Sequence, residues 1–426
     1  MNQDNLWLKL DNAAKIYPAS RTRRWTALFR LSAELDQPVD RTVLEKALMR
    51  VTRRMPGFAL KLRRGFFWYY LEHLDGFPAL QDDVANPCVR MDLKENDGFM
   101  FRVRVHHCRI AVEFFHVLSD GAGGFVFLKT LVAEYLSLLH NKPIPRSADI
   151  LDCDQPPRDD ELEDAFLKYA RPLTMSRKEA VAYRLRGTPA DPHFMHIISG
   201  VLPSGRLAAL AKEHGATVGE FLSALLIWSV YRVQQSDPVK RRRRQPVKVC
   251  VPVNLRQFYP TRTLRNFASY VNPGIQPALG EYDFDEILAI VRHQIALEVT
   301  EKNLNVKFST NVGDERNRLL RPVPLFIKNP VMRLIFYLSG DRNASTIISN
   351  LGRAQLPAEM AAHVKRLDFM LGSLSRTRVT CACVSYGENT VINFTRAIRE
   401  SEVERIFFTT LVEMGVPVTV ESNQRY

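Results

Sequence analysis

The sequence predicts an α/β protein, built as an α+β sandwich of two packed halves. The chain of 426 residues is 46% hydrophobic and 25% charged, which is the composition of a globular protein with a large core. Segments in which apolar residues alternate, as in strands, are mixed with segments of helical spacing. Their irregular order favours a sandwich over a doubly wound parallel sheet. The length favours two halves over one continuous core.

The first half begins with a predicted strand and helix. The segment WTALFRLSAEL at 25–35 alternates as a half-buried strand does. A helix follows, with Asp40 as its N-cap and its end near the MPG at 55–57. The next stretch predicts two short strands joined at Arg64-Gly65. This stretch and the region after it contain five aromatic residues of interest: Phe66, Phe67, Trp68, Tyr69 and Phe125. We expect most of them to pack in the core, and the alternative is that they line an apolar acceptor site.

A pair of strands is predicted over 101–115, and a glycine-rich turn, FHVLSDGAGG, follows at the end of the second strand. The residues after the turn, from Phe125 to Tyr135, have the apolar spacing of a helix. From 141 to 164 the chain is rich in proline and acidic residues and poor in periodic apolar ones, so we expect a surface connection there.

The second half also mixes strands and helices. The segment at 193–202 is strand-like, and a short helix after it ends at Gly215. Thr217 and Glu220 form a capping box that opens the next helix. Strands are predicted for KVCVPVN, STIISNLG, TCACVSYG and TVINFT, and helices for 283–300 and for the final ESEVERIFFTTLVEMG.

The net charge of +13 alone does not identify a partner. The densest basic run is KRRRR at 240–244, which we interpret as a solvated connecting loop in preference to a dedicated anion site. It has no aromatic platform and no known nucleic-acid motif beside it, so we expect no nucleic-acid partner.

The cysteines have no paired spacing, and the first residues lack the apolar core of a signal peptide, so we expect a cytoplasmic protein. Cys381 and Cys383 are predicted to be small buried hydrophobes, and no cluster completes a metal site. Apolar runs such as 221–231 are shorter than the roughly 20 residues of a spanning helix, so we predict no transmembrane segment.

The turn after the strand pair carries the residues best suited to chemistry. His116 stands at the end of an apolar strand, Asp120 follows four residues later, and glycines at 121, 123 and 124 permit a tight turn. A histidine held in this way acts as a base near neutral pH. The sequence has no GxSxG, Walker A, GxGxxG or HExxH motif and no paired CxxC, which leaves other hydrolase, nucleotide, dehydrogenase and metal chemistries without support.

His116, Asp120 and Gly121 match HxxxDG, so the sequence resembles the superfamily of chloramphenicol acetyltransferase, BAHD acyltransferases and condensation domains. Three further matches follow in the family's order: VPVNLRQFYP with RNF at 251–267, SNLG at 349–352, and the C-terminal IFFTTLVEMGVPVTVESN. The sequence looks most similar to bacterial alcohol acetyltransferase-like and condensation-domain-like proteins.

The resemblance implies two chloramphenicol-acetyltransferase-like halves, residues 1–165 and 185–426, joined by 166–184, with a channel between them and His116 near its middle. His116 is then the catalytic base, and Asp120 pairs with an arginine of the second half, for which Arg256 is our candidate. Asn266 matches a position that braces the same region. The oxyanion donor is left open among Ser349, Asn350 and the backbone amides from Gly121 to Gly124, with turn formation as the alternative role of Ser349 and Asn350.

The resemblance also implies an acyl-CoA donor, no permanently bound cofactor, and a small alcohol or amine as acceptor. The basic run Arg241, Arg242, Arg243 and Arg244 is a candidate for binding the phosphates of coenzyme A. Two alternatives remain: a donor held on an acyl carrier protein, and a catalytically silent binding protein. Condensation domains usually carry two histidines before xxxDG, whereas position 115 is Phe, which favours free acyl-CoA.

Overall fold

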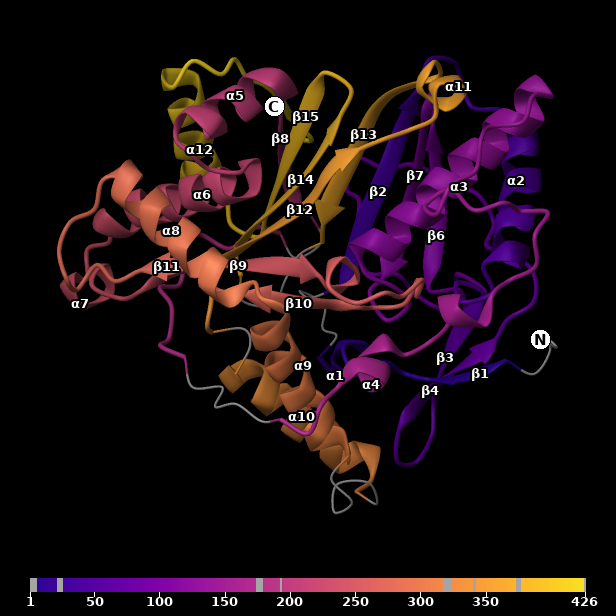
Figure 1. The fold of residues 1–426 in the computed structure, drawn as a ribbon, viewed down its shortest axis with the longest axis horizontal. Coiled ribbons are helices and arrows are strands. Elements are labelled where there is room, and N and C mark those ends of the chain that lie inside the picture. The colour runs from indigo at the N-terminus through magenta and orange to yellow at the C-terminus, as the bar shows by residue number, and fades with distance from the viewer. Residues whose placement is uncertain are drawn as a thin grey trace.

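The computed structural model describes residues 6–20, 26–173, 179–191, 194–316, 323–339, 342–372 and 377–424. Within these ranges the strands form three sheets, with the orders β13-β2-β7-β6-β5, β1-β4-β3 and β10-β9-β12-β14-β15-β8-β16, and β11 pairs with β9 at one edge of the last. Figure 1 shows the two larger sheets side by side in two lobes, each with helices packed on it. The predicted α+β sandwich is therefore confirmed.

The N-terminal lobe is built on the sheet that contains β2 and β7, with helices α2 and α3 packed together on it. Asp40 caps α2 by accepting a hydrogen bond of 3.0 Å from the amide of Val43, as its position predicted. The elements of this part of the chain are β1 (Trp7–Lys9), α1 (Ile16–Ser20), β2 (Leu28–Leu35), α2 (Arg41–Arg54), β3 (Leu60–Arg64), β4 (Tyr69–His73), β5 (Gln81–Asp82), β6 (Phe101–His106), β7 (Arg109–Phe115), α3 (Gly121–His140), η2 (Asp159–Glu161) and α4 (Ala165–Tyr169).

The C-terminal lobe is built on the mixed sheet, in which β12 runs parallel to both β9 and β14 while the other pairs are antiparallel. Both hydrogen bonds of the predicted capping box at Thr217 and Glu220 are present. The elements here are β8 (His196–Pro203), α5 (Ser204–Glu213), α6 (Val218–Gln235), α7 (Lys240–Arg243), β9 (Val247–Asn254), η3 (Leu255–Gln257), β10 (Ala268–Val271), β11 (Gly274–Ile275), α8 (Phe284–Glu298), α9 (Glu301–Arg316), α10 (Leu325–Ser339), β12 (Thr346–Ala354), α11 (Ala358–Ala361), β13 (Val364–Leu371), β14 (Val379–Tyr386), β15 (Asn389–Arg396), α12 (Glu402–Glu413) and β16 (Thr419–Ser422).

Strand β13 joins the two lobes. It belongs by sequence to the second half but pairs with β2 at the edge of the N-terminal sheet. On its other side, Asn393 of β15 donates a hydrogen bond of 2.9 Å to the carbonyl oxygen of Phe369. The second half therefore supplies a strand to the first lobe's sheet. The boundaries at residues 165 and 185 stay a prediction.

Two local predictions were wrong. Strand β2 is not half-buried but buried on both faces, because Arg30 on its polar face is held within the protein by Asp83 and Glu113. The basic run is not an open loop, since its residues Lys240–Arg243 form the short helix α7 after Asp237 accepts a hydrogen bond from the amide of Val239. Trp25 and His193, at the starts of two predicted strands, lie outside the described residues.

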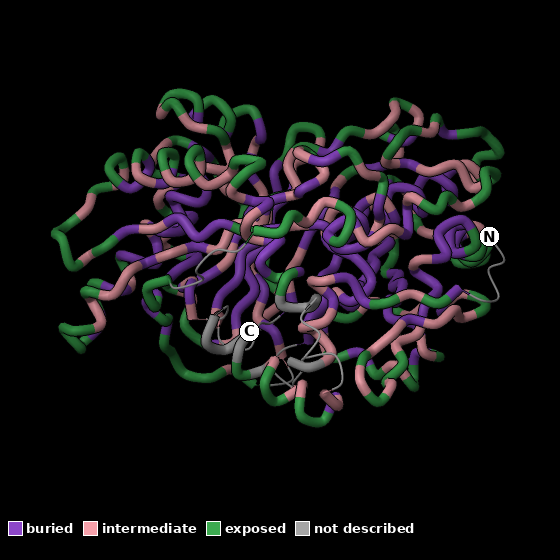
Figure 2. Tube along the Cα trace, turned by 60° about the horizontal axis from the view of Figure 1, so that its bottom comes forward, coloured by how far each residue is buried: buried purple, intermediate pink, exposed green. Residues whose placement is uncertain are grey.

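Buried residues concentrate in the strands inside both lobes, and exposed residues lie on the outer helices and loops (Figure 2). Among the described residues, one helix, α3, is long and apolar enough to cross a membrane. Helices α5 and α6 reach that length and hydropathy only together, as a pair bent by 81°. Because 72% of the apolar window of α3 is buried inside the protein, α3 has the character of a core helix.

Candidate active site

The end of β7 positions the predicted catalytic histidine. His116 follows Phe115 directly, and its amide donates a hydrogen bond of 2.9 Å to the carbonyl oxygen of Ala27, so the backbone is fixed to the neighbouring chain. The chain then turns within four residues and enters α3 at Gly121. The strand end and the helix start thus hold the HxxxDG segment from both sides.

The carboxylate of Asp120 lies inside this turn and makes no contact that suits proton transfer to a substrate. One oxygen caps α3 by accepting from the amide of Gly123 at 3.0 Å. The other accepts from Arg256 at 2.8 Å and from the amide of Phe267 at 2.8 Å. Burial by itself would raise the pKa of Asp120, but the Arg256 guanidinium and these hydrogen bonds outweigh it and lower the pKa. Asp120 is therefore a structural anion, and the predicted pair with Arg256 is present.

Arg256 connects this carboxylate to the loop that follows β9. Its guanidinium donates to the carbonyl oxygens of Thr263 at 2.9 Å and Arg265 at 2.6 Å, and to the side chain of Asn254 at 3.2 Å. One side chain therefore satisfies several backbone groups of the loop while it neutralises Asp120. The result is a loop of the second half fixed against the histidine turn of the first.

Close packing explains the glycines after Asp120. A Cβ atom at position 123 would lie 2.2 Å from the carbonyl oxygen of Leu264 and 2.2 Å from Oγ of Ser119. A Cβ atom at position 124 would lie 2.8 Å from the ring of Phe29. These positions need glycine because neighbouring groups, including the second-half loop, occupy the space of a side chain.

Asn266 determines which nitrogen of His116 carries the proton. Its Nδ2 donates to the carbonyl oxygen of His116 at 3.0 Å and to the carboxylate of Asp11 at 3.3 Å. Its Oδ1 consequently faces Nδ1 of His116, at 2.9 Å. Because an amide oxygen only accepts, Nδ1 must carry the hydrogen, which leaves the lone pair on Nε2. Asn266 thus contacts His116 directly, and the contact leaves Nε2 as the basic nitrogen.

Aromatic rings enclose the imidazole. Tyr17 stacks on it with ring centroids 4.6 Å apart, and Phe29 meets it edge-on at 5.2 Å. Burial lowers the pKa of His116 below its usual value, although Asp120 and the Asn266 hydrogen bond act in the opposite direction. The imidazole is therefore neutral, and able to accept a proton, at neutral pH.

The sequence analysis did not identify Asp11 and Tyr17. Asp11 is fully buried, accepts a hydrogen bond of 2.8 Å from the amide of Ala14, and lies 3.7 Å from Arg265. Burial raises the pKa of Asp11, while Arg265 and the hydrogen bonds limit the rise. The N-terminal segment thus supplies both an anchor for Asn266 and a ring against His116. The only local signal of Asp11 is an aspartate five residues before α1, which is common in turns.

The SNLG segment contributes to the same region through one face of β12. Leu351 reaches the histidine turn, since its Cδ2 would lie 3.1 Å from a Cβ atom at Gly121. Asn350 lies near Gly219, so Ser349, the residue before it, points to the other face of β12, and a β-bulge interrupts the strand pairing after Asn350. Asn350 also accepts a hydrogen bond of 2.7 Å from the amide of Gly352, so its role is to shape the turn.

These positions narrow the candidates for the oxyanion donor. The amides of Gly123 and Gly124 are already engaged with the side chain and the carbonyl oxygen of Asp120. Asn350 is on the far face of its strand. Ser349 and the amides at Gly121 and Ala122 therefore remain the candidates from the predicted set.

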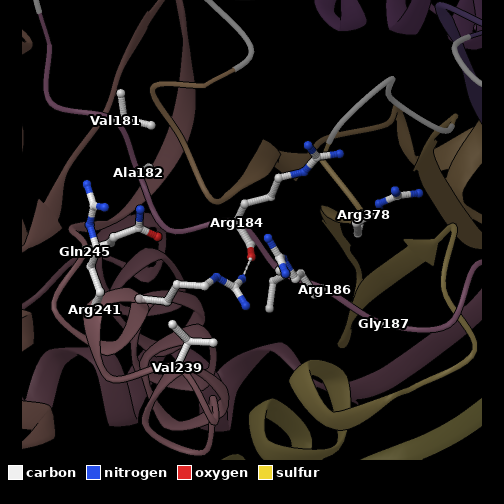
Figure 3. Close-up of a pocket in the computed structure, with 11 residues that line it drawn as sticks. Val181, Ala182, Arg184, Arg186, Gly187, Val239, Arg241, Gln245 and Arg378 are labelled. Carbon is white, nitrogen blue, oxygen red and sulfur yellow. Dashed lines mark hydrogen bonds between the residues drawn. The ribbon is translucent and has the colours of Figure 1, made fainter.

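The basic run lies away from this site. Figure 1 shows α7 at the outer edge of the C-terminal lobe, whereas α3 begins at the junction of the lobes. Arg241 and Arg242 line a cavity of about 620 Å³ together with three further arginines, Arg184, Arg186 and Arg378 (Figure 3). Arg242 is held there by an ion pair with Asp237 and by the ring of Tyr183. Arg243 and Arg244 are not among the residues that line this cavity.

The cysteine and metal predictions concern residues outside this site. Cys381 and Cys383 are fully buried, as predicted, and burial raises the pKa of both thiols. Within the described part of the chain, no group of three or more His, Cys, Asp or Glu residues is arranged to hold a metal ion.

The two-lobed fold is shared with solved acetyltransferase and condensation-domain structures that match almost the whole chain. No family model matches the sequence, and no curated protein matches it either.

Three of these structures illustrate the likeness. Polyketide synthase associated protein 5 from Mycobacterium tuberculosis is 15% identical with a TM-score of 0.62, and the match covers 97% of this chain and 99% of that one. The TRI3 trichothecene 15-O-acetyltransferase from Fusarium sporotrichioides is 10% identical with a TM-score of 0.63, over 96% and 94%. The first condensation domain of the CDA synthetase is 14% identical with a TM-score of 0.59, over 98% and 100%. At such identities the comparison establishes the fold and leaves the reaction to be argued from the site.

The hydrogen bond from His116 to Asn266 leads to a test. For the wild-type protein, we expect kcat/KM to rise with pH as His116 loses its proton. The midpoint of this acidic limb of the pH profile should lie below about 6.5, the ordinary pKa of histidine, because burial lowers the pKa of His116. We expect Asn266→Ala to lower kcat by roughly one to two orders of magnitude with KM unchanged, by analogy with other orienting partners. The limb should also move to lower pH. The hydrogen bond from Asn266 raises the pKa of His116 in the wild type, so its removal lowers that pKa further.

Kinetics over a pH series, with circular dichroism to verify folding, measure both effects. A change in KM with unaltered kcat and an unmoved limb would contradict the positioning role of Asn266.

Proposed function

We propose that the protein is an acyltransferase that moves an acyl group from a coenzyme A thioester to the hydroxyl or amine of a small acceptor. The observation that carries this proposal is the orientation of Asn266, which leaves the lone pair of His116 on Nε2. A neutral imidazole with one fixed basic nitrogen is the group that acyl transfer to an alcohol or amine requires.

The reaction follows from this geometry. Nε2 of His116 takes the proton from the acceptor as its oxygen or nitrogen attacks the thioester carbon. The tetrahedral intermediate then collapses, the carbon–sulfur bond breaks, and Nε2 returns the proton to the departing sulfur. The products are the ester or amide and the free thiol. Asp120 takes no proton in this reaction, since its pKa is lowered and its carboxylate already accepts hydrogen bonds from Arg256 and the amide of Phe267.

The developing oxyanion needs a hydrogen-bond donor from the protein. We propose Ser349 for this role, because it points to the face of β12 opposite Asn350 and precedes by two residues Leu351, whose side chain lies against the histidine turn. The amides at Gly121 and Ala122 are the alternative donors.

Coenzyme A as donor is supported by the solved structures of similar fold. TRI101 of F. graminearum is described in complex with coenzyme A and the T-2 mycotoxin, and a starter condensation domain of rhizomide synthetase in complex with C8-CoA. The second of these is a condensation domain, so a donor carried on an acyl carrier protein remains the second candidate. Phe115 before His116, in place of a second histidine, favours the free thioester.

The remaining parts of the proposal concern cofactors and location. The proposed chemistry needs no permanently bound cofactor and no metal. The six cysteines are free thiols, which supports the proposed cytoplasmic location. The oriented imidazole of His116 argues against a silent binding protein, because binding alone does not need a basic nitrogen fixed on one side of the ring.

Thiol release tests the proposal directly. With a panel of acyl-CoA thioesters and pooled alcohols and amines, we expect release that depends on the acceptor and falls about 10²- to 10⁴-fold in His116→Ala. Circular dichroism checks that the variant folds, since the imidazole packs against Tyr17 and Phe29. Release that persists in the variant would remove His116 as the base. Release only with an acyl carrier protein would establish the second candidate, and none with either donor would favour a silent protein.

The proposed contact between the basic run and the donor phosphates needs its own test. We expect Arg241→Glu to raise KM for acyl-CoA several-fold while kcat is retained. Arg244→Glu, with the same charge change on a residue that does not line the cavity, is the matched control. An unchanged KM in Arg241→Glu would exclude the run from the donor site.

A further inference from the structure

Large apolar side chains are exposed together on two adjoining segments, α10 and the tip of the β3–β4 hairpin. Core packing was the prediction for most of the hairpin aromatics, and for two of them it was wrong. The exposed fractions range from 47% to 66% for six residues: Phe66, Trp68, Phe326, Ile327, Val331 and Leu334. We call these six residues the apolar surface.

Hydrogen bonds join the two segments, so the apolar surface is continuous. The amide of Leu325 donates to the carbonyl oxygen of Phe66 at 2.9 Å. Lys328 donates to the carbonyl oxygen of Phe67 at 3.0 Å, and Asn329 donates to the hydroxyl of Tyr69 at 2.9 Å. Figure 1 shows the hairpin tip beside α10 on the lower side of the molecule.

The pattern of α10 is unusual for a helix at a protein surface. Ile327, Val331 and Leu334 follow one another at helical spacing of four and three residues, which is the stripe that a surface helix normally buries. Here that stripe faces outward, while Leu325 at the start of the helix is buried. A helix with apolar residues on both its buried and its exposed sides indicates a second apolar environment outside the protein.

The charges around the apolar surface indicate what that environment is. The sequence of α10, from Leu325 to Ser339, has two basic residues and no acidic one. The hairpin from Lys61 to Tyr70 has three basic residues and no acidic one, and the first acid after it, Glu72, pairs with Arg63. Apolar and aromatic side chains bordered by basic residues are the composition of helices that lie in the interface of an anionic bilayer.

The apolar surface also adjoins the candidate active site. Helix α10 packs against α1, and Tyr17 of α1 stacks on His116. An apolar molecule held at the surface would therefore meet the protein on the side from which the N-terminal segment covers the catalytic histidine.

We propose that the apolar surface on α10 and the β3–β4 hairpin binds the surface of a membrane that contains anionic phospholipid, and thereby presents the active site to the membrane interface. The side chains of the apolar surface enter the headgroup region, and the neighbouring basic residues meet the lipid phosphates. This proposal concerns a binding surface and does not depend on the proposed acyl transfer.

Flotation of the full chain with lipid vesicles tests the proposal. We expect binding to vesicles of phosphatidylcholine with phosphatidylglycerol, weaker binding to phosphatidylcholine alone, and a decrease in binding with added salt. We expect Phe66→Ser with Phe326→Ser to lower the vesicle partition coefficient at least about tenfold. The matched control is Leu279→Ser with Val412→Ser, which removes two exposed apolar side chains elsewhere.

A second measurement does not rely on removing apolar residues. Vesicles of brominated phospholipid should quench the tryptophan fluorescence of the wild-type protein. The Trp68→Phe variant should show much less quenching. Absence of vesicle binding by the wild type, or equal loss in the control variant, would overturn the proposal. So would a dimer of the wild type, found by light scattering, that Phe66→Ser with Phe326→Ser dissociates, because the apolar surface would then be an interface between two copies.

Discussion

The ion pair between Asp120 and Arg256 is the constraint on which the candidate active site depends. Asp120 is buried, and its oxygens accept hydrogen bonds from Gly123, Arg256 and Phe267, which together start α3 and hold the loop of the second half. A buried carboxylate is tolerated only when it is paired and fully hydrogen-bonded. The two lobes must therefore meet in one arrangement for either the turn or the loop to be stable.

The loop transmits this constraint to His116, the proposed base. Phe267, which donates to Asp120, follows Asn266, which contacts both the ring and the carbonyl oxygen of His116. The position of the ion pair thus sets the position of the Asn266 side chain, and the side-chain amide of Asn266 sets the tautomer of the His116 imidazole. Asp11 completes the arrangement from the N-terminal segment by fixing which end of the amide faces the ring. The imidazole held in this way is neutral at neutral pH, and Nε2 is its basic nitrogen.

The sequence predicted the parts of this site that depend on local order. The HxxxDG spacing, the strand before it and the helix after it were predictable because alternation and helical periodicity report burial directly. Arg256 and Asn266 were predictable only through resemblance, since their contacts with residues 120 and 116 span more than a hundred positions. Asp11 and Tyr17 were missed because no pattern in the N-terminal segment indicates a partner so distant in sequence. The exposure of Phe66 and Trp68 was missed for the opposite reason: aromatic composition predicts apolar contact but does not say whether the contact is inside the protein.

A double-mutant cycle on the ion pair tests the central claim most directly. Free energies of unfolding would be measured by denaturant titration for the wild type, Asp120→Asn, Arg256→Met and the double variant. We expect each single change to cost about 3–5 kcal/mol, because it leaves an unpaired buried partner. The double variant should then cost less than the sum of the two by roughly 2 kcal/mol or more. Losses that simply add would contradict the account, since Asp120 and Arg256 would then stabilise their own lobes independently.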